Sequence, residues 1–301
     1  TLAQPGLTDR MHRTQVSALY FASVCSLGGF LFGFDASVIS GVIGFIVPEF
    51  GLSDWQLGLV VGAPTLGGII ASFSGAILAD RFGRRRILVY LAMLYTVSAL
   101  VSAWAPNYQV LVIARFVGGL AFGSLGIAPM YIGEIAPPEK RGMLVTVNQL
   151  SIVLGFSLAY FVNYLVLQLS QSGNDWVQLV GLDQNAWRWM LGIEAIPAAL
   201  WLSLLTTIPE SPRWLFMVGR KKEARSVLAR ISPAECIEQA ATEIAASLRG
   251  VQEKFLDRAR EIFLPSMRLP LAIGLIAAVA QQVTGVNAIY FYPPTIFEQS
   301  G

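Results

Sequence analysis

Gly75-Ala-Ile-Leu-Ala-Asp-Arg-Phe-Gly-Arg-Arg-Arg86 ends one apolar stretch and begins another. Its charged residues are Asp80, Arg81, Arg84, Arg85 and Arg86. Each flanking stretch has the roughly 20 apolar residues that a membrane-spanning helix needs. Gly83, between them, tolerates backbone conformations that other residues avoid. The stretch therefore predicts a tight, charged turn that joins two membrane helices at one face of a bilayer.

The composition agrees with a membrane protein. Only 13% of the residues are charged and 54% are hydrophobic, whereas soluble domains average about 25% charged residues. Seven apolar stretches can span: 16–47, 57–78, 87–105, 110–131, 144–169, 189–208 and 271–297. The first stretch is too long for a cleaved signal peptide. We expect an all-α, multi-pass protein of the cell membrane, in contact with the lipid bilayer.

The charges alternate between the two sides of these spans. Residues 48–56, 106–109 and 170–188 hold four carboxylates and a single cation, Arg188. The other connections hold the arginine-rich turn, then Lys140 and Arg141, then eleven Lys or Arg residues from Arg213 to Arg268. The positive-inside rule places these basic connections and the N-terminus in the cytoplasm. A seven-helix receptor with an external N-terminus does not fit this bias.

Several functions lack support in the sequence. There is no Walker A or Rossmann glycine pattern, and the single histidine, His12, lies near the N-terminus. We expect no enzyme activity, no cofactor and no metal site. The basic residues follow the membrane face, as topogenic charges do, and do not indicate nucleic-acid binding. Cys25 lies in a span and Cys236 in a basic connection, so no disulfide is expected. Nothing indicates an oligomeric state.

Three charged residues stand inside the apolar spans. Asp35 lies mid-span in the first, and Arg115 is the only cation within any span. Glu194 is a second isolated carboxylate, in the sixth span. Ionisable side chains are costly in a bilayer and are functional candidates by default. We predict a proton-coupling site formed by Asp35 and Arg115, with Glu194 as an accessory. A static ion pair that fixes helix packing is the alternative.

A short repeat relates the first and fourth spans. Residues 28–33, Gly-Gly-Phe-Leu-Phe-Gly, resemble residues 118–123, Gly-Gly-Leu-Ala-Phe-Gly. Each block lies in the first span of a three-span unit, and the two units enter the membrane from opposite sides. Inverted repeats of this kind are typical of transporters. Small residues at helix interfaces are the simpler explanation.

The chain divides into three parts. Residues 1–208 are expected to form a six-helix bundle. Residues 209–265 are polar and amphipathic, which predicts short cytoplasmic helices. Residues 266–301 begin a second bundle with the seventh span. That span becomes polar at Gln281, Gln282 and Asn287, and Gly285 permits a break in its helix. Broken helices are tolerated where they line a cavity.

Five stretches together resemble the sugar porter family of the major facilitator superfamily. They are residues 75–86, Arg115-Phe-Val-Gly-Gly119, residues 129–142, Pro209-Glu-Ser-Pro-Arg-Trp-Leu215 and Gln281-Gln-Val-Thr-Gly-Val-Asn287. The resemblance extends from about Ser17 to Gly301. It implies a fold of twelve helices in two halves, of which this chain holds the first half, the cytoplasmic helices and helix 7. A chain that stops there is expected to insert but not to transport alone.

The resemblance also assigns the site residues. It places sugar ligands at Gln149, Gln281, Gln282 and Asn287, with Phe32 as an aromatic lining residue. Side-chain amides suit sugar hydroxyls because they both donate and accept hydrogen bonds. They also match a neutral ligand without burying charge. Phe156 stands where bacterial xylose–proton symporters have glutamine, so the resemblance does not assign a pentose.

A charged network is implied at the cytoplasmic ends of the helices. Its members are Asp80, Arg84, Arg85, Glu134, Arg141, Glu210 and Arg213. In the family such residues form ion pairs that close when the carrier faces outward. Single exposed pairs stabilise by only about 0–1 kcal/mol, but several together can bias a conformational equilibrium. The simpler alternative is that these arginines only set the topology.

The sequence thus predicts a monosaccharide transporter that works by alternating access, with proton symport as the mechanism. A facilitative uniporter for sugars or polyols is the main alternative. The animal facilitative glucose carriers have asparagine at the position of Asp35 and an apolar residue at that of Glu194, so both carboxylates favour symport. A sugar-sensing receptor with the same fold is a third possibility.

Overall fold

The computed structural model describes residues 5–137, 140–232, 236–248 and 264–291, and every regular element in these ranges is helical. Six helices or helix pairs form the main bundle: α1 (Pro5–Phe50), α2 (Asp54–Phe82), α3 (Arg84–Ala103), α4–α5 (Tyr108–Leu120, Ser124–Ile135), α6 (Arg141–Ser170) and α8–α9 (Ala186–Ile193, Ala195–Leu205). The short α7 (Asp175–Leu179) precedes α8. With the segment Pro265–Val283, seven segments are long and apolar enough to cross a membrane.

Three of the spans are interrupted. A 3₁₀ turn, Ala121–Gly123, separates α4 from α5. Glu194 stands at the junction of α8 and α9. Pro197 follows closely and has no N–H to donate to the carbonyl of Ile193, which weakens the helix there. The seventh span breaks at Gly285 (φ +71°), between α14 (Arg268–Val283) and α15 (Val286–Phe291). Gly285 is also the residue at which the sequence predicts the break.

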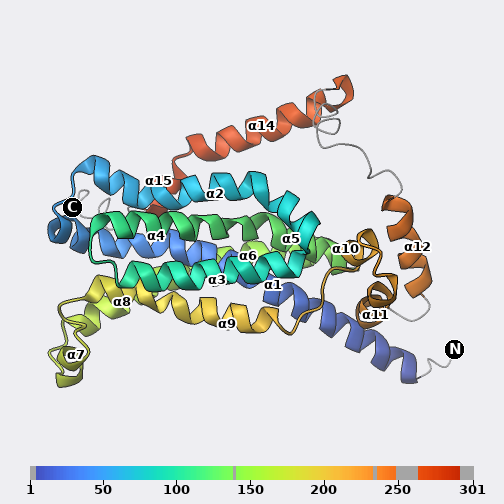
Figure 1. Ribbon diagram of the computed structural model, residues 1–301, viewed down its shortest axis with the longest axis horizontal. Helices are drawn as coiled ribbons and strands as arrows, with labels where there is room; N and C mark the ends of the chain where they lie inside the picture. Colours follow the sequence, from blue (N-terminus) through green and yellow to red (C-terminus); the bar gives the residue numbers. More distant parts are fainter. Residues whose placement is uncertain (1–4, 138–139, 233–235, 249–263, 292–301) are drawn as a thin grey trace.

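Glycines let two helix pairs approach closely. A Cβ on Gly33 of α1 would meet the backbone of α6, and one on Gly155 of α6 would meet the backbone of α1. Gly67 of α2 and Gly119 of α4 face each other in the same way. The first span therefore packs on the fifth as the fourth packs on the second (Figure 1). This is the pairing that an inverted three-plus-three repeat requires.

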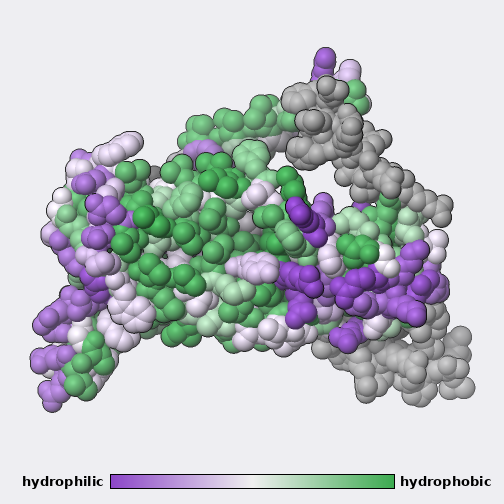
Figure 2. Space-filling model, in the orientation of Figure 1, coloured by the Kyte–Doolittle hydropathy of each residue, from purple (hydrophilic) through white to green (hydrophobic). Residues whose placement is uncertain are grey.

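The two ends of the bundle differ in charge. The arginine-rich end, which we define by Arg84–Arg86 and the helices α10 (Pro212–Met217), α11 (Lys221–Ile231) and α12 (Ile237–Leu248), lies at the right of Figure 1. The opposite end carries α7 and the α1–α2 connection. Figure 2 shows an apolar band between two hydrophilic ends. Many large apolar side chains on this band are exposed, including Phe73, Tyr90 and Phe161, as expected of a lipid-facing surface.

The α14 helix stands apart from the bundle. Figure 1 shows it beside α2, and α15 links it back to α1. All its residues are exposed, including Gln281 and Gln282.

Candidate functional site

Asp35, Arg115 and Glu194 meet inside the bundle. Arg115 Nη1 donates to Asp35 Oδ1 at 2.5 Å, and Arg115 Nη2 lies 3.4 Å from the main-chain oxygen of Asp35. The Glu194 carboxyl interacts with both the Asp35 carboxyl and Arg115. The exposed fractions are 3% for Asp35, 2% for Arg115 and 3% for Glu194. Three spans thus bring their isolated charges to one point.

The charge of this group is unbalanced. Two ionised carboxylates and one guanidinium leave a formal charge of −1 in a nearly solvent-free environment. Asp35 Oδ2 and Arg115 Nε have no hydrogen-bond partner within the described residues. A buried net charge is expensive, and one proton on either carboxylate would cancel it.

A cavity of about 940 Å³ lies between the bundle and α14–α15. Phe32 of α1, Gln149 of α6, and Gln281 and Gln282 of α14 line it. Arg115 also reaches its wall. Four of the five predicted sugar-site residues are therefore on one cavity. The fifth, Asn287, belongs to α15, but its side chain lies outside the described residues.

Aromatic side chains form one wall of the cavity. Phe156 stacks on Tyr290 with ring centroids 4.5 Å apart, and Phe32 packs edge-on against Phe122 at 4.8 Å. Tyr160 donates from its hydroxyl to the main-chain oxygen of Tyr290 at 2.7 Å. Phe156, which stands where the xylose symporters have glutamine, therefore lies at the contact between α6 and α15. Tyr160 lines the cavity too, although no motif in the sequence marks it as a site residue.

The arginine-rich end holds a hydrogen-bonded cluster around Arg84. Arg84 Nη2 lies 2.8 Å from Asp80 Oδ1 and 3.0 Å from Glu134 Oε1. Ser211 Oγ donates to Glu134 Oε2 at 2.5 Å and also caps α10 by accepting from the N–H of Trp214. Ser211 was not predicted, although a serine before a proline is a common start of a helix. The cluster joins the turn after α2 to α5 and α10.

Arg85 and Glu210 tie the start of α3 to the segment after α9. Glu210 Oε1 accepts from the backbone N–H of Arg85 at 3.0 Å, and the Arg85 guanidinium donates to the main-chain oxygens of Leu205 and Thr206. Gly83 makes room for this contact, because its φ is +102° and a Cβ there would meet the Glu210 carboxylate. The other two predicted members, Arg141 and Arg213, form no hydrogen bond or ion pair within the described residues.

A second cluster, not foreseen from the sequence, closes the opposite end. Glu49 accepts from Trp187 Nε1 at 2.5 Å and from Arg188 Nη2 at 3.0 Å. Arg188 also donates to the main-chain oxygens of Ala103 and Ala105 and stacks over the ring of Trp187 at 4.2 Å. These contacts join the ends of α1, α3 and α8. The sequence feature that could have indicated this cluster is Arg188, the single cation in the acidic connections.

The chain matches known transporters along nearly its whole length. The model of the sugar (and other) transporter family matches residues 21–301. The arabinose-proton symporter of Bacillus subtilis (strain 168) is 37% identical over 303 residues, which cover 100% of this chain and 63% of the relative. The D-xylose transporter of Levilactobacillus brevis is 38% identical over 294 residues, with coverages of 97% and 60%. The chain thus spans less than two thirds of either relative.

Solved structures show the same architecture. The xylose transporter XylE from E. coli, in a partially occluded inward-open conformation, is 33% identical with a TM-score of 0.78 and covers 93% of this chain and 67% of that chain. The proton:xylose symporter XylE bound to 6-bromo-6-deoxy-D-glucose has the same identity, a TM-score of 0.79 and coverages of 96% and 64%. The predicted all-α major facilitator fold is confirmed. The chain belongs to the sugar porter family of the major facilitator superfamily.

Proposed function

We propose that the protein transports a neutral monosaccharide across the cell membrane by alternating access, in symport with a proton. The observation that carries the proposal is the position of Arg115. It pairs with Asp35 inside the bundle and also reaches the cavity that the glutamines line. One side chain therefore contacts both the protonatable group and the space where a sugar would bind.

The proton step follows from the charge of the buried group. A proton that enters from the outer side binds Asp35 or Glu194 and removes the excess negative charge. Protonation of Asp35 weakens its hold on Arg115, since the attraction between full charges is lost. Arg115 and the helix that carries it can then shift at the cavity wall. When the pair re-forms in the inward-facing state, the proton is released to the cytoplasm.

The cavity chemistry suits a sugar. Gln149, Gln281 and Gln282 offer donors and acceptors to hydroxyl groups without adding charge. Phe32 and Phe156 provide an apolar wall for the carbon face of the ring. The named relatives act on arabinose and xylose, and a solved neighbour holds a glucose derivative. These names support the class of monosaccharides, and Asn287 completes the proposed ligand set.

The arginine-rich end is proposed to be the cytoplasmic gate, with the N-terminus on the same side. Its hydrogen-bonded members join α2, α3, α5 and α10 in the described conformation. Arg141 and Arg213 are proposed to join them in another conformation of the cycle. Residues 1–208 would form the moving bundle, 209–265 the cytoplasmic helices, and 266–301 the start of the second bundle.

The test is uptake by the full-length protein in proteoliposomes. A panel of labelled pentoses and hexoses is offered with and without a pH gradient, acidic outside. Symport predicts accumulation of one or more sugars above equilibrium only when the gradient is present. Equilibration at the same level with and without the gradient would identify a uniporter, and no uptake of any sugar would contradict the proposed substrate class.

A further inference from the structure

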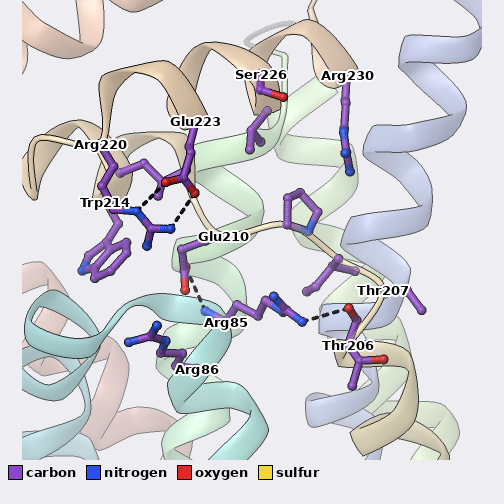
Figure 3. Close-up of a pocket in the computed structure, with 14 residues that line it drawn as sticks. Arg85, Arg86, Thr206, Thr207, Glu210, Trp214, Arg220, Glu223, Ser226 and Arg230 are labelled. Atoms are coloured by element: carbon purple, nitrogen blue, oxygen red, sulfur yellow. Dashed lines mark hydrogen bonds and ion pairs between the residues drawn. The ribbon is translucent and has the colours of Figure 1, made fainter.

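The third and sixth spans are tied to each other at both ends. At the arginine-rich end, the Arg85 guanidinium donates to the main-chain oxygen of Leu205, the last residue of α9, and to that of Thr206 (Figure 3). At the opposite end, the Arg188 guanidinium donates to two main-chain oxygens at the end of α3, at 3.2 and 2.8 Å. The last carbonyls of a helix have no partner within it, so each arginine satisfies the end of the other span.

Arg188 is in turn fixed by α1. Its Nη2 lies 3.0 Å from Glu49 Oε1, and its guanidinium lies over the ring of Trp187. The other carboxylate oxygen of Glu49 accepts from Trp187 Nε1, and Trp187 is only 1% exposed. One turn further along α8, a Cβ on Gly192 would lie 3.3 Å from Ala103 of α3. The start of α8 is therefore held against both α1 and α3.

Between these two ends the sixth span is broken at Glu194. The break separates α8 from α9, and Pro197 cannot restore the missing hydrogen bond. Because the helix is not continuous, α9 does not by itself determine the position of α8. Glu194 follows Arg188 by six residues, or about 9 Å along a helix at 1.5 Å per residue. The contacts of Arg188 thus determine where the carboxylate at the end of α8 lies.

We infer that Arg188, held by Glu49, is a positioning residue that keeps Glu194 beside Asp35 and Arg115. This inference rests on the proposed proton symport and assigns a role in it to a contact at the far end of α8. Arg188 touches neither the buried charges nor the cavity, so it acts only through the helix that carries Glu194.

The effect on proton binding has a definite sign. The charged or titratable groups that face Glu194 are Asp35 of α1, Arg115 of α4 and Tyr95 of α3. Two neighbouring carboxylates repel each other when both are ionised, which favours the binding of one proton. If α8 shifts after the loss of Arg188, the carboxylates separate and this repulsion decreases. The group then needs a more acidic medium to take up its proton.

The experiment measures uptake by the full-length protein in proteoliposomes, with a labelled sugar that the wild type accumulates. The initial rate is recorded against outer pH at constant inner pH. Arg188→Gln should move the pH of half-maximal uptake toward acid by about one unit, the scale of the effect of a neighbouring charge. Counterflow of the same sugar without a pH gradient should persist. A purely structural defect would lower the rate at every pH without moving the midpoint.

Matched variants separate positioning from the charge of Arg188 itself. Loss of that positive charge alone would favour protonation of the carboxylates and move the midpoint toward alkaline pH, which is the opposite direction. Arg188→Lys keeps the charge but lacks the planar fork, so it should give a smaller acid shift. Asp183→Asn removes an exposed carboxylate from the connection before α8 that has no hydrogen bond or ion pair among the described residues. It should leave the midpoint unchanged.

A double variant tests whether Arg188 acts through Glu194. Glu194→Gln should itself shift the midpoint toward acid, and Arg188→Gln added to it should cause no further acid shift. An unchanged or more alkaline midpoint in Arg188→Gln would overturn the inference. An equal acid shift with and without Glu194 would do the same, and both results would leave symport intact. Uptake by the wild type that does not depend on a pH gradient would contradict the proposed symport and this role together.

Discussion

Arg115 binds Asp35 at two points, the carboxylate at 2.5 Å and the main-chain oxygen at 3.4 Å, 80 positions apart in the chain. The contact joins the first span of one three-helix unit to the first span of the other. A change in the charge of Asp35 would therefore alter the contact between the two units and, through Arg115, the wall of the cavity. This connection is the basis of the coupling that we propose between a proton and a sugar.

The amide side chains should determine sugar affinity. Removal of a side chain that hydrogen-bonds a buried ligand hydroxyl costs about 1–3 kcal/mol. Gln282→Ala in the full-length protein should thus weaken sugar binding by about tenfold, measured by calorimetry. Gln168→Ala removes an exposed amide of α6 that does not line the cavity and serves as the control. Unchanged affinity in alanine variants of Gln149, Gln281, Gln282 and Asn287 would mean that these amides only pack helices.

The α1–α6 contact should not tolerate a side chain at Gly155. A Cβ there would clash with the backbone of Phe30 and Phe34, and such overpacking costs about 1–3 kcal/mol. Gly155→Ala should lower the thermal unfolding midpoint measured in detergent. Gly126→Ala, in α5 with nothing near its added Cβ, should leave the midpoint unchanged or raise it. A drop of equal size in both variants would disprove the close approach.

The accessibility of one cysteine to a thiol reagent tests the proposed topology. Cys236 is exposed beside α12, whereas Cys25 is buried in α1. If the arginine-rich end is cytoplasmic, an impermeant thiol reagent should label Cys236 only after the cells are permeabilised. Cys236→Ser controls for other thiols. Labelling of intact cells at Cys236 would reverse the orientation of the protein.

The packing of α12 on α11 should weaken in acid. Two hydrogen bonds from Arg225 lower the pKa of the Glu238 carboxyl. A lowered pKa means that the stabilisation is complete above the ordinary glutamate value and is lost as pH falls below about 4. The protection of the α12 amides, measured as the exchange rate relative to the intrinsic rate at the same pH, should fall in that range. Glu238→Gln should remove this pH-dependent fall, while Glu243→Gln, which lacks an arginine partner, should keep it.

Much of the fold follows from the sequence because the membrane restricts the choices. The length of the apolar stretches predicts the spans, and Gly285 predicts the break in the seventh. Asp35 and Arg115 lie at similar depths in their spans, and opposite charges that are costly to bury in a membrane stabilise each other when they meet. Their contact was therefore plausible from the sequence. These predictions need only the position of a residue along its own helix.

Contacts that depend on which faces of helices meet were not predictable in this way. The contacts of Ser211 with Glu134 and of Glu49 with Trp187 join residues 77 and 138 positions apart, and no periodicity pairs them. Arg141 and Arg213 were grouped with the other charged residues of this end because the resemblance to the sugar porters implies a network there. Among the described residues they form no hydrogen bond or ion pair, because charge places a residue at a membrane face without determining its partner.

The most direct test of the account is transport by the Asp35→Asn variant of the full-length protein in proteoliposomes. Asparagine resembles the protonated acid but cannot release a proton, so coupling should be lost while the cavity stays intact. We predict that Asp35→Asn binds sugar and exchanges it by counterflow, yet does not accumulate it under a pH gradient that drives the wild type. Accumulation at the wild-type level would contradict the account and leave Asp35 with a structural role.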